Sequence, residues 1–512
     1  GNLAATATTG NMTDSGALTV AGTSSFTTSA NNADITLNTT TNAFTGAVTI
    51  TTNDSGVLTQ YNPTAITTYG STRSPGNEQY PNAIDNNVNT KFLNFNETGS
   101  GFVVTFSNAT VIDKLTFTTA NDDYGRDPAA VSIYGSNTSA SSGFSLIESN
   151  VSLTRVTNRY SAYNSGSGDT FTNSTAYKHY RVVVTAVHNA AAANSFQFSE
   201  VDFYDTGTTG SGTDADVTID GGTTALILAA STVDGNLNLR SGHASGITDS
   251  GTLTVSGDLS ATTDANNGII NLGTLAVDGA VAVTTNGTGN VTIDNGTKAL
   301  KLAQSSVGGN LTLTSGNASG IIDTGTVTVG GNLSAATDAN NGVINLGTLA
   351  VDGTVAVNTN GSGNATVVND AGLTFAASTV GGALSATATT GNITDADRLT
   401  IAGISSFTTS ANNATVALNT TTNAFTGAVT ITTNDDSGTD ADVTIDGGTT
   451  ALTFAASTID GDLTVRSGNA SGITDSGTLT VGGNLAATTD ANNGLINLGT
   501  LAVDGTVQLT TN

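Results

Sequence analysis

The chain has 512 residues, 37% of them hydrophobic, and a formal net charge of −27 with only 13 Lys and Arg. This charge argues against nucleic acid or an anionic membrane as a partner, because both recruit basic surfaces. The absence of cysteine excludes disulfides and thiolate metal sites, and no apolar run approaches the roughly 20 residues that span a bilayer, so no membrane insertion is expected.

Residues 1–56 introduce a pattern that the chain repeats. The segment SSFTTSANNADITLNTTTNAFTGAVTITTND, which starts at Ser24, recurs from Ser405 with three changes. Internal copies of this kind are typical of solenoid proteins, in which each repeat packs only against its neighbours.

A second motif occupies residues 470–507, and two close relatives precede it. Its runs TLTV and LINL place apolar residues at every second position, which is the period of a β-strand, and Gly, Asn or Asp close each run. In an earlier copy, apolar residues recur about every 22 residues, at Leu237, Leu259 and Val281. The pattern predicts an all-β fold in which the coils of a parallel β-solenoid stack about 4.8 Å apart.

The two copies of the first pattern differ in the residues that come after them. The later copy continues as TTNDDSGTDADVTIDGGTTAL, whereas the first reaches TTNDSG at 51–56 and then departs. The pattern resumes with GTDADVTIDGGTTAL at Gly212. We therefore predict that residues 57–211 form a domain inserted in a solenoid corner, between solenoid segments 1–56 and 212–512.

The predicted insertion has a different composition from the rest of the chain. It holds every tyrosine and every proline, together with most of the Lys and Arg. Its runs FVVTFS, AVSIYGS, HYRVVVTAV and FQFSEVDFYD alternate apolar and polar residues between turn-rich loops, which predicts an antiparallel β-sandwich.

Four segments of this insertion, NAIDNNVNTKFLNF, GSGFVVTF, LTFTTANDDYGRDPAAVSIYGSN and FSEVDFYD, resemble the discoidin or coagulation factor 5/8 C-terminal family. The resemblance implies a galactose-binding-like jelly roll with a structural calcium ion held by Asp85, Asn87, Thr90 and Glu200. Carboxylate, hydroxyl and carbonyl oxygens are the ligands that calcium prefers. The alternative is an Asx-type turn without metal, in which Thr90 caps Asp85.

The loop TANDDYGRDP is dense with hydrogen-bonding groups. It is a candidate rim that contacts a glycan through Asp123, Tyr124 and Arg126, because sugar recognition combines polar contacts with an aromatic platform. The alternative is a structural turn in which Arg126 pairs with Asp122 or Asp127.

Two tyrosines in the loop NRYSAYNSGSGD, Tyr160 and Tyr163, are further candidates for stacking on a sugar ring. They are expected to be more exposed than the tyrosines of the strands.

The segment GNLTLTSGNASGIIDTGTVTVGGNLSAATD, from Gly309, is similar to the repeats of filamentous haemagglutinin-like secreted adhesins. The resemblance implies a right-handed parallel β-helix and an extracellular or cell-surface location in a bacterium. The TDANNG corners, and the carboxylates around Asp214 and Asp440, could bind calcium between coils or form solvated turns in which asparagines stack on their copies.

Catalysis has little support in this sequence, and no enzyme is predicted. A polysaccharide-cleaving solenoid needs clustered carboxylates and a basic residue on one face. The basic residues outside the insertion are scattered over many coils: Arg240, Lys298, Lys301, Arg398 and Arg466.

Two functions remain open. In the first, the chain is part of a bacterial surface fibre, sheath or layer, and copies of it associate. Head-to-tail association is one expected mode, because no capping turns are visible at either end. In the second, it is an adhesin whose discoidin-like domain binds glycans or neighbouring surfaces from a passive stalk.

Overall fold

The computed structural model describes residues 1–53, 59–70, 73–95, 98–154, 156–166, 168–173, 175–206, 215–434 and 441–512. The chain forms two compact units, one of Gly1–Asn53 with Ala215–Asn512 and one of Asp54–Asp214. The boundaries predicted from the sequence, between 56 and 57 and between 211 and 212, lie outside the described residues. Within those residues the fold is all-β, and the helical elements are three short 3-10 turns: η1 (Tyr80–Ile84), η2 (Tyr124–Arg126) and η3 (Tyr163–Gly166). No helix among them has the length and apolar character to cross a membrane.

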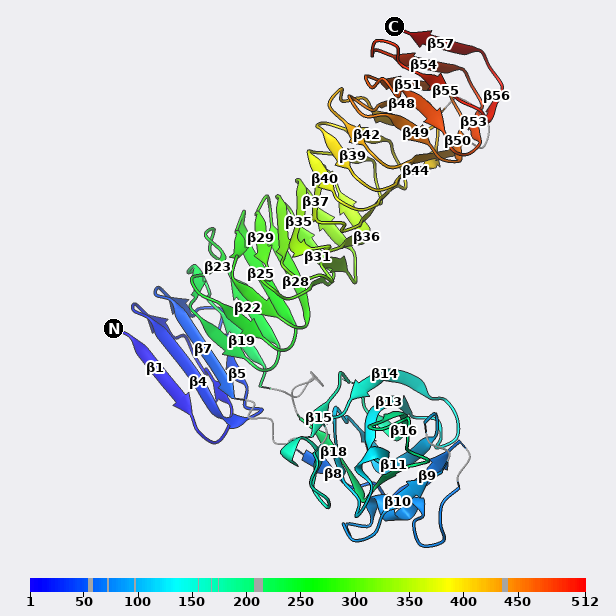
Figure 1. The fold of residues 1–512 in the computed structure, drawn as a ribbon. Coiled ribbons are helices and arrows are strands. Elements are labelled where there is room, and N and C mark those ends of the chain that lie inside the picture. The colour runs from blue at the N-terminus through cyan, green and yellow to red at the C-terminus, as the bar shows by residue number, and fades with distance from the viewer. Residues whose placement is uncertain are drawn as a thin grey trace. The chain divides into compact units, whose positions relative to one another are not determined.

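The first unit is a parallel β-solenoid, as predicted. Its coils follow one another along one axis from β1 (Leu3–Ala7) to β57 (Val507–Thr511), and their strands form two long parallel sheets (Figure 1). A representative coil contains β22 (Leu237–Ser241), β23 (Ile247–Asp249) and β24 (Leu253–Val255).

Each strand lies on the strand one coil earlier, in register. Leu237 of β22 lies opposite Leu259 of β25 (Leu259–Asn266), which lies opposite Val281 of β28 (Ala280–Asn286). The predicted spacing of about 22 residues per coil is therefore confirmed. Alternate side chains point inward: Leu237 and Leu239 are buried, whereas Asn238 between them is exposed. Full burial of such aliphatic side chains stabilises a fold by about 1.5–3 kcal/mol each.

Corner asparagines join successive coils on the outside of the solenoid. Asn310 Oδ1 accepts a hydrogen bond from the backbone N–H of Asn332 at 2.8 Å, and Asn332 Oδ1 accepts one from Thr354 at 2.8 Å. In a TDANNG corner, Asn341 adopts a left-handed φ of 63° and its Oδ1 accepts the N–H of Ser362 at 2.8 Å. These corners are turns in which asparagine bridges to the adjacent coil. Asp214 and Asp440 lie outside the described residues.

A short column of strands ends inside the solenoid at a buried asparagine. The column runs from β7 (Val48–Asn53) through β21 (Ser231–Val233) and β24 to β27 (Leu275–Val277). Above β27 lies Asn295, whose amide takes the place of a further strand: Oδ1 accepts from Val277 N at 2.8 Å, and Nδ2 donates to Val277 O at 3.0 Å and Ala299 O at 2.8 Å. Asn369 makes the corresponding contacts with Val351 and Gly372. Both amides satisfy backbone groups that would otherwise be buried without partners.

Successive copies of the repeat change sheets. The strand β22 and its copy β41 (Leu384–Ala388) lie in the 21-stranded sheet. The copies β32 (Leu311–Ser315) and β51 (Leu463–Ser467) lie in the 23-stranded sheet. Equivalent positions of adjacent repeats therefore belong to different faces of the solenoid.

The second unit is an antiparallel β-sandwich, also as predicted (Figure 1). A five-stranded sheet has the order β14 (Ser145–Ser152), β13 (Pro128–Ser136), β16 (Tyr177–Val187), β11 (Gly101–Thr110) and β9 (Ala65–Tyr69). A four-stranded sheet has the order β15 (Asp169–Thr170), β12 (Lys114–Thr118), β18 (Glu200–Asp205) and β8 (Thr59–Tyr61), and a third sheet pairs β10 (Phe92–Asn94) with β17 (Phe196–Phe198). Residues from all three sheets form one aromatic core, in which the Phe198 ring packs edge-on against Phe117 with centroids 4.9 Å apart.

The solenoid register is the same with and without the sandwich. Val48 and Thr51 of β7 (Val48–Asn53), the last strand before the sandwich, lie opposite Leu228 and Thr232 of the next coil. In the later copy, β47 (Val429–Asn434) pairs its Val429 with Phe454 and its Thr432 with Thr458. The same two strand positions are used in both places.

Candidate functional site

The predicted rim loop is held as a turn by its own side chains. Asp123 Oδ1 accepts the N–H of Gly125 at 2.8 Å, and Arg126 Nε lies 3.5 Å from Asp123 Oδ2. Arg126 therefore pairs with Asp123, whereas the partners predicted for a structural turn were Asp122 and Asp127. Tyr124 is 53% exposed and projects from this turn.

A buried lysine anchors the same loop from below. Lys91 Nζ lies 3.1 Å from both carboxylate oxygens of Asp122 and 3.0 Å from Gln197 Oε1. Partial burial opposes ionisation of Asp122, but hydrogen bonds with Gln197 and Lys91 prevail and lower the pKa of its carboxyl. Asp122 therefore carries a negative charge that is paired with Lys91.

A second loop packs against the first through Arg159. Its guanidinium forms two hydrogen bonds with the fully buried Asp127 carboxylate, at 2.7 and 2.8 Å, and donates to Ala120 O at 2.8 Å. The next residue, Tyr160, is 47% exposed and has a φ of 55°. A left-handed conformation is unfavourable for a bulky side chain, so the surrounding contacts impose it.

The prediction that Tyr163 stacks on a sugar is wrong. Its side chain is fully buried in the aromatic core, and its hydroxyl donates to Pro128 O at 3.1 Å. Of the two tyrosines in this loop, only Tyr160 offers a surface to a ligand. The two loops together present Tyr124, Tyr160, Asp123 and Arg126 on adjacent, hydrogen-bonded segments.

The four predicted calcium ligands lie together. Asn87 N–H is 2.9 Å from Asp85 Oδ1 and 2.8 Å from Glu200 Oε1, and Thr90 Oγ1 is 2.8 Å from Asp85 Oδ2 and 2.7 Å from Asn87 O. The turn is made possible by Asn86, which adopts a left-handed φ of 59° that asparagine tolerates. The Asx-turn contacts of the alternative are thus present, and they leave two carboxylates side by side.

The chemistry of this cluster fits a divalent cation. Burial and the neighbouring Asp85 carboxylate raise the pKa of Glu200 to about 8, because burial disfavours the charged form and the second carboxylate repels it. A calcium ion would relieve this repulsion, using carboxylate, hydroxyl and carbonyl oxygens. The described residues contain no group of three or more His, Cys, Asp or Glu side chains placed to hold a metal. Neutral oxygens of Asn87 and Thr90 would therefore have to complete the coordination shell of the ion.

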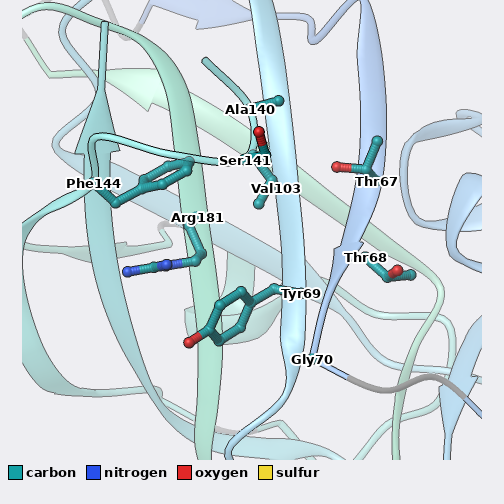
Figure 2. Close-up of a pocket in the computed structure, with 9 residues that line it drawn as sticks. All are labelled: Thr67, Thr68, Tyr69, Gly70, Val103, Ala140, Ser141, Phe144 and Arg181. Atoms are coloured by element: carbon teal, nitrogen blue, oxygen red, sulfur yellow. The ribbon is translucent and has the colours of Figure 1, made fainter. Parts of the chain in front are cut away.

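A groove that the sequence did not reveal lies on the face of the five-stranded sheet opposite the core. Its volume is about 420 Å³, and Thr67, Tyr69, Ser141, Phe144 and Arg181 are among the residues that line it (Figure 2). The alternation of β9 and β16 places Tyr69 and Arg181 on the outer face, and this position could have been predicted from the sequence. The sequence could not predict the pairing of distant strands that brings these side chains together.

Comparisons with known proteins gave a family match and matches to solved structures. The family described as repeats of unknown function (DUF5649) matches residues 1–51, 214–286, 288–360, 362–432 and 440–512. No curated protein matches the chain.

Among solved structures, the chain is similar to the CBM32-1 and CBM32-2 domains of Clostridium perfringens ZmpB in complex with GalNAc, with 20% identity over 28% of this chain and a TM-score of 0.23. The match spans 33% of that structure's own length. The family 32 CBM of C. perfringens NanJ in complex with galactose is 14% identical over 29% of this chain and all of its own, with a TM-score of 0.23. The family match covers most of the solenoid, and the chain belongs to the DUF5649 family of repeats of unknown function.

Proposed function

We propose that the chain is an extracellular structural rod of a bacterial surface fibre, sheath or layer, and that the rod displays the sandwich as a carbohydrate-binding module. The observation that carries this proposal is the unchanged solenoid register across the insertion, where β7 and β47 use the same partners in the next coil. A solenoid whose strand pairing does not change when a domain is inserted is suited to display that domain.

The solenoid surface supports a structural rather than a catalytic role. Three of its five basic side chains pair with neighbouring carboxylates: Arg240 Nε lies 2.6 Å from Asp264, Lys298 Nζ lies 2.5 Å from Asp278, and Arg466 contacts Asp490. A polysaccharide-cleaving site needs its acid and base free to exchange protons. We therefore retain the proposal that the chain is not an enzyme.

Assembly of the rod is tested by replacing residues 54–214 with the segment DDSGTD that joins the coils of the later copy. We expect the shortened chain to keep the far-ultraviolet circular dichroism of the solenoid and to form the same filaments by electron microscopy as the full chain. Single short rods from both chains, with and without calcium, would refute the fibre and leave an adhesin stalk.

Glycan binding is the second candidate, and the strained, exposed Tyr160 favours it. A bulky residue held in a left-handed conformation lowers stability by about 1–2 kcal/mol, a loss that function explains more readily than folding does. A glycan array with the full chain should give binding that Tyr160→Ala or Tyr124→Ala abolishes. Ile404→Ala, which trims a 64% exposed apolar residue of the solenoid, is the matched control. Binding that survives both tyrosine variants would contradict this site.

Calcium is the proposed structural cofactor of the sandwich, held by Asp85, Glu200, Thr90 and Asn87. The support is the convergence of two carboxylates without a basic partner at hydrogen-bond distance in the described residues. Added calcium should raise the melting temperature of the sandwich, and Asp85→Asn should remove the increase. Equal stabilisation of wild type and Asp85→Asn would reject this cluster as the site.

A further inference from the structure

The groove on the outer sheet face is organised around Arg181. Backbone pairing aligns Thr67, Val103, Arg181 and Tyr134 in one row across β9, β11, β16 and β13. The core-facing residues of these strands alternate with this row, so the row lies on the opposite face. The charged group of Arg181 therefore stands on a sheet surface away from the hydrophobic core.

Three aromatic rings hold the guanidinium of Arg181. Its central carbon lies 4.4 Å from the ring centroid of Tyr69, 4.2 Å from that of Tyr134 and 4.6 Å from that of Phe144. Figure 2 shows the group extending between the rings of Phe144 and Tyr69. Stacking of this kind is favourable and fixes the plane of the guanidinium, and Arg181 is among the residues that line the groove.

The donors of the Arg181 guanidinium have no partner within the described part of the chain. Arg181 forms no ion pair there, and its Nε is buried without a hydrogen bond. Arg159, by contrast, uses three nitrogens on Asp127 and Ala120. A guanidinium that is held in place and has no anionic partner in the chain is suited to bind an anionic ligand.

The groove around Arg181 suits an acidic sugar. None of its lining residues is Asp or Glu, and the lining hydroxyls of Thr67 and Ser141 can exchange hydrogen bonds with a saccharide. Its volume of about 420 Å³ lies in the range of small-ligand sites. The net charge of −27 opposes an anion only weakly at this point, because charges beyond about 8 Å are screened at physiological ionic strength.

We propose that this groove binds the carboxylate of an acidic saccharide, a uronic acid residue, through a bidentate contact with Arg181. The aromatic rings set the plane of the guanidinium, and the hydroxyls of the groove contact the sugar. The site adds an acid-specific subsite to the carbohydrate binding proposed above. It lies on sheet strands and the Ala140–Phe144 loop, and so uses none of the residues of the Tyr124 and Tyr160 rim.

The test is calorimetric titration of the full chain with tetramers of mannuronate, galacturonate and glucuronate. Carboxyl-reduced versions of the same tetramers are the matched ligands. We expect at least one uronate tetramer to bind and its reduced form to bind at least tenfold more weakly. Arg181→Lys keeps the charge and loses the fork, and should weaken uronate binding about tenfold. Ser141→Asp, which adds a carboxylate at an exposed position of the groove, should do the same without touching the stack.

Tyr160→Ala separates the two proposals, because it should abolish binding at the rim and leave uronate affinity unchanged. Uronate binding that is lost in Tyr160→Ala and kept in Ser141→Asp would move the acidic ligand to the rim and overturn the inference. Equal affinity for uronate and reduced tetramers, or no binding of any uronate tetramer, would also overturn it. A tetra-aspartate peptide that binds as tightly as a uronate would replace the saccharide with a protein partner.

Discussion

The buried asparagine that ends a strand column should be one of the most sensitive positions of the solenoid. Asn295→Ala removes an amide that satisfies Val277 N–H, Val277 C=O and Ala299 C=O. Asn295 is fully buried, so water does not readily replace the amide. Each buried backbone group left without a partner costs about 1–3 kcal/mol. Two such groups at Val277 give an expected loss of about 2–6 kcal/mol of local stability.

A global melting temperature would understate this effect. Coils of a solenoid contact only their neighbours, so unfolding need not be two-state and damage in one coil is diluted over the rest. Native-state hydrogen exchange reports each amide separately. A loss of about 3 kcal/mol corresponds to exchange about a hundredfold faster at Val277 and its neighbours in β27.

The repeat supplies matched controls for Asn295→Ala. Asn369→Ala should accelerate exchange at Val351 to the same extent, because the two asparagines make the same contacts. Asn290→Ala removes only an exposed hydrogen bond to Asn310 N, and should cost about 0.5–1.5 kcal/mol. If exchange at Val277 changes no more in Asn295→Ala than exchange at Asn310 does in Asn290→Ala, the amide does not replace a strand.

The sandwich offers two further predictions. In calcium-free protein, the pKa of Glu200 is about 8 in the folded state against an ordinary 4.5, so between these values the folded state binds a proton that the unfolded state has released. The contribution of Glu200 to stability should therefore be fully present below pH 4.5 and be lost as the pH rises through 8. Thermal unfolding should show this fall relative to Glu200→Gln, and a parallel pH profile for the two proteins would contradict it. Arg159→Leu removes the guanidinium that makes two hydrogen bonds with the buried Asp127 carboxylate, and should cost about 1.5–3 kcal/mol in denaturant unfolding of the sandwich. Arg126→Leu breaks an exposed pair and should cost about 1 kcal/mol or less; equal losses in the two variants would refute the distinction.

The parts of the fold that were predictable are those in which residues meet their own copies. Leu237, Leu259 and Val281 stack because the same spacing recurs, so sequence alone established the register of the coils. The strands of the sandwich followed from alternation, and a positive φ at Asn86 allowed the turn that carries Asp85.

The side chains of the loops were less predictable, because their burial depends on strands distant in sequence. Tyr160 and Tyr163 share one loop and one composition, yet one is exposed and the other fills the core beneath Pro128. The groove around Arg181 has the same origin: Tyr69 and Arg181 are more than a hundred residues apart and meet only through β11. Asn295 resembles any other corner asparagine until the column that it ends is known.

The exchange of sheets between adjacent repeats has a consequence for how such a chain grows. When a repeat is duplicated, the strands of the new copy lie in the opposite sheet from those of its parent. Every inward residue must therefore pack equally well in either of the two sheets. This explains the restricted alphabet of the interior, where Leu, Val and Ile recur at most core positions. It also means that domains inserted at the same corner of consecutive repeats would leave the solenoid from alternate sides, so that neighbouring domains would not collide.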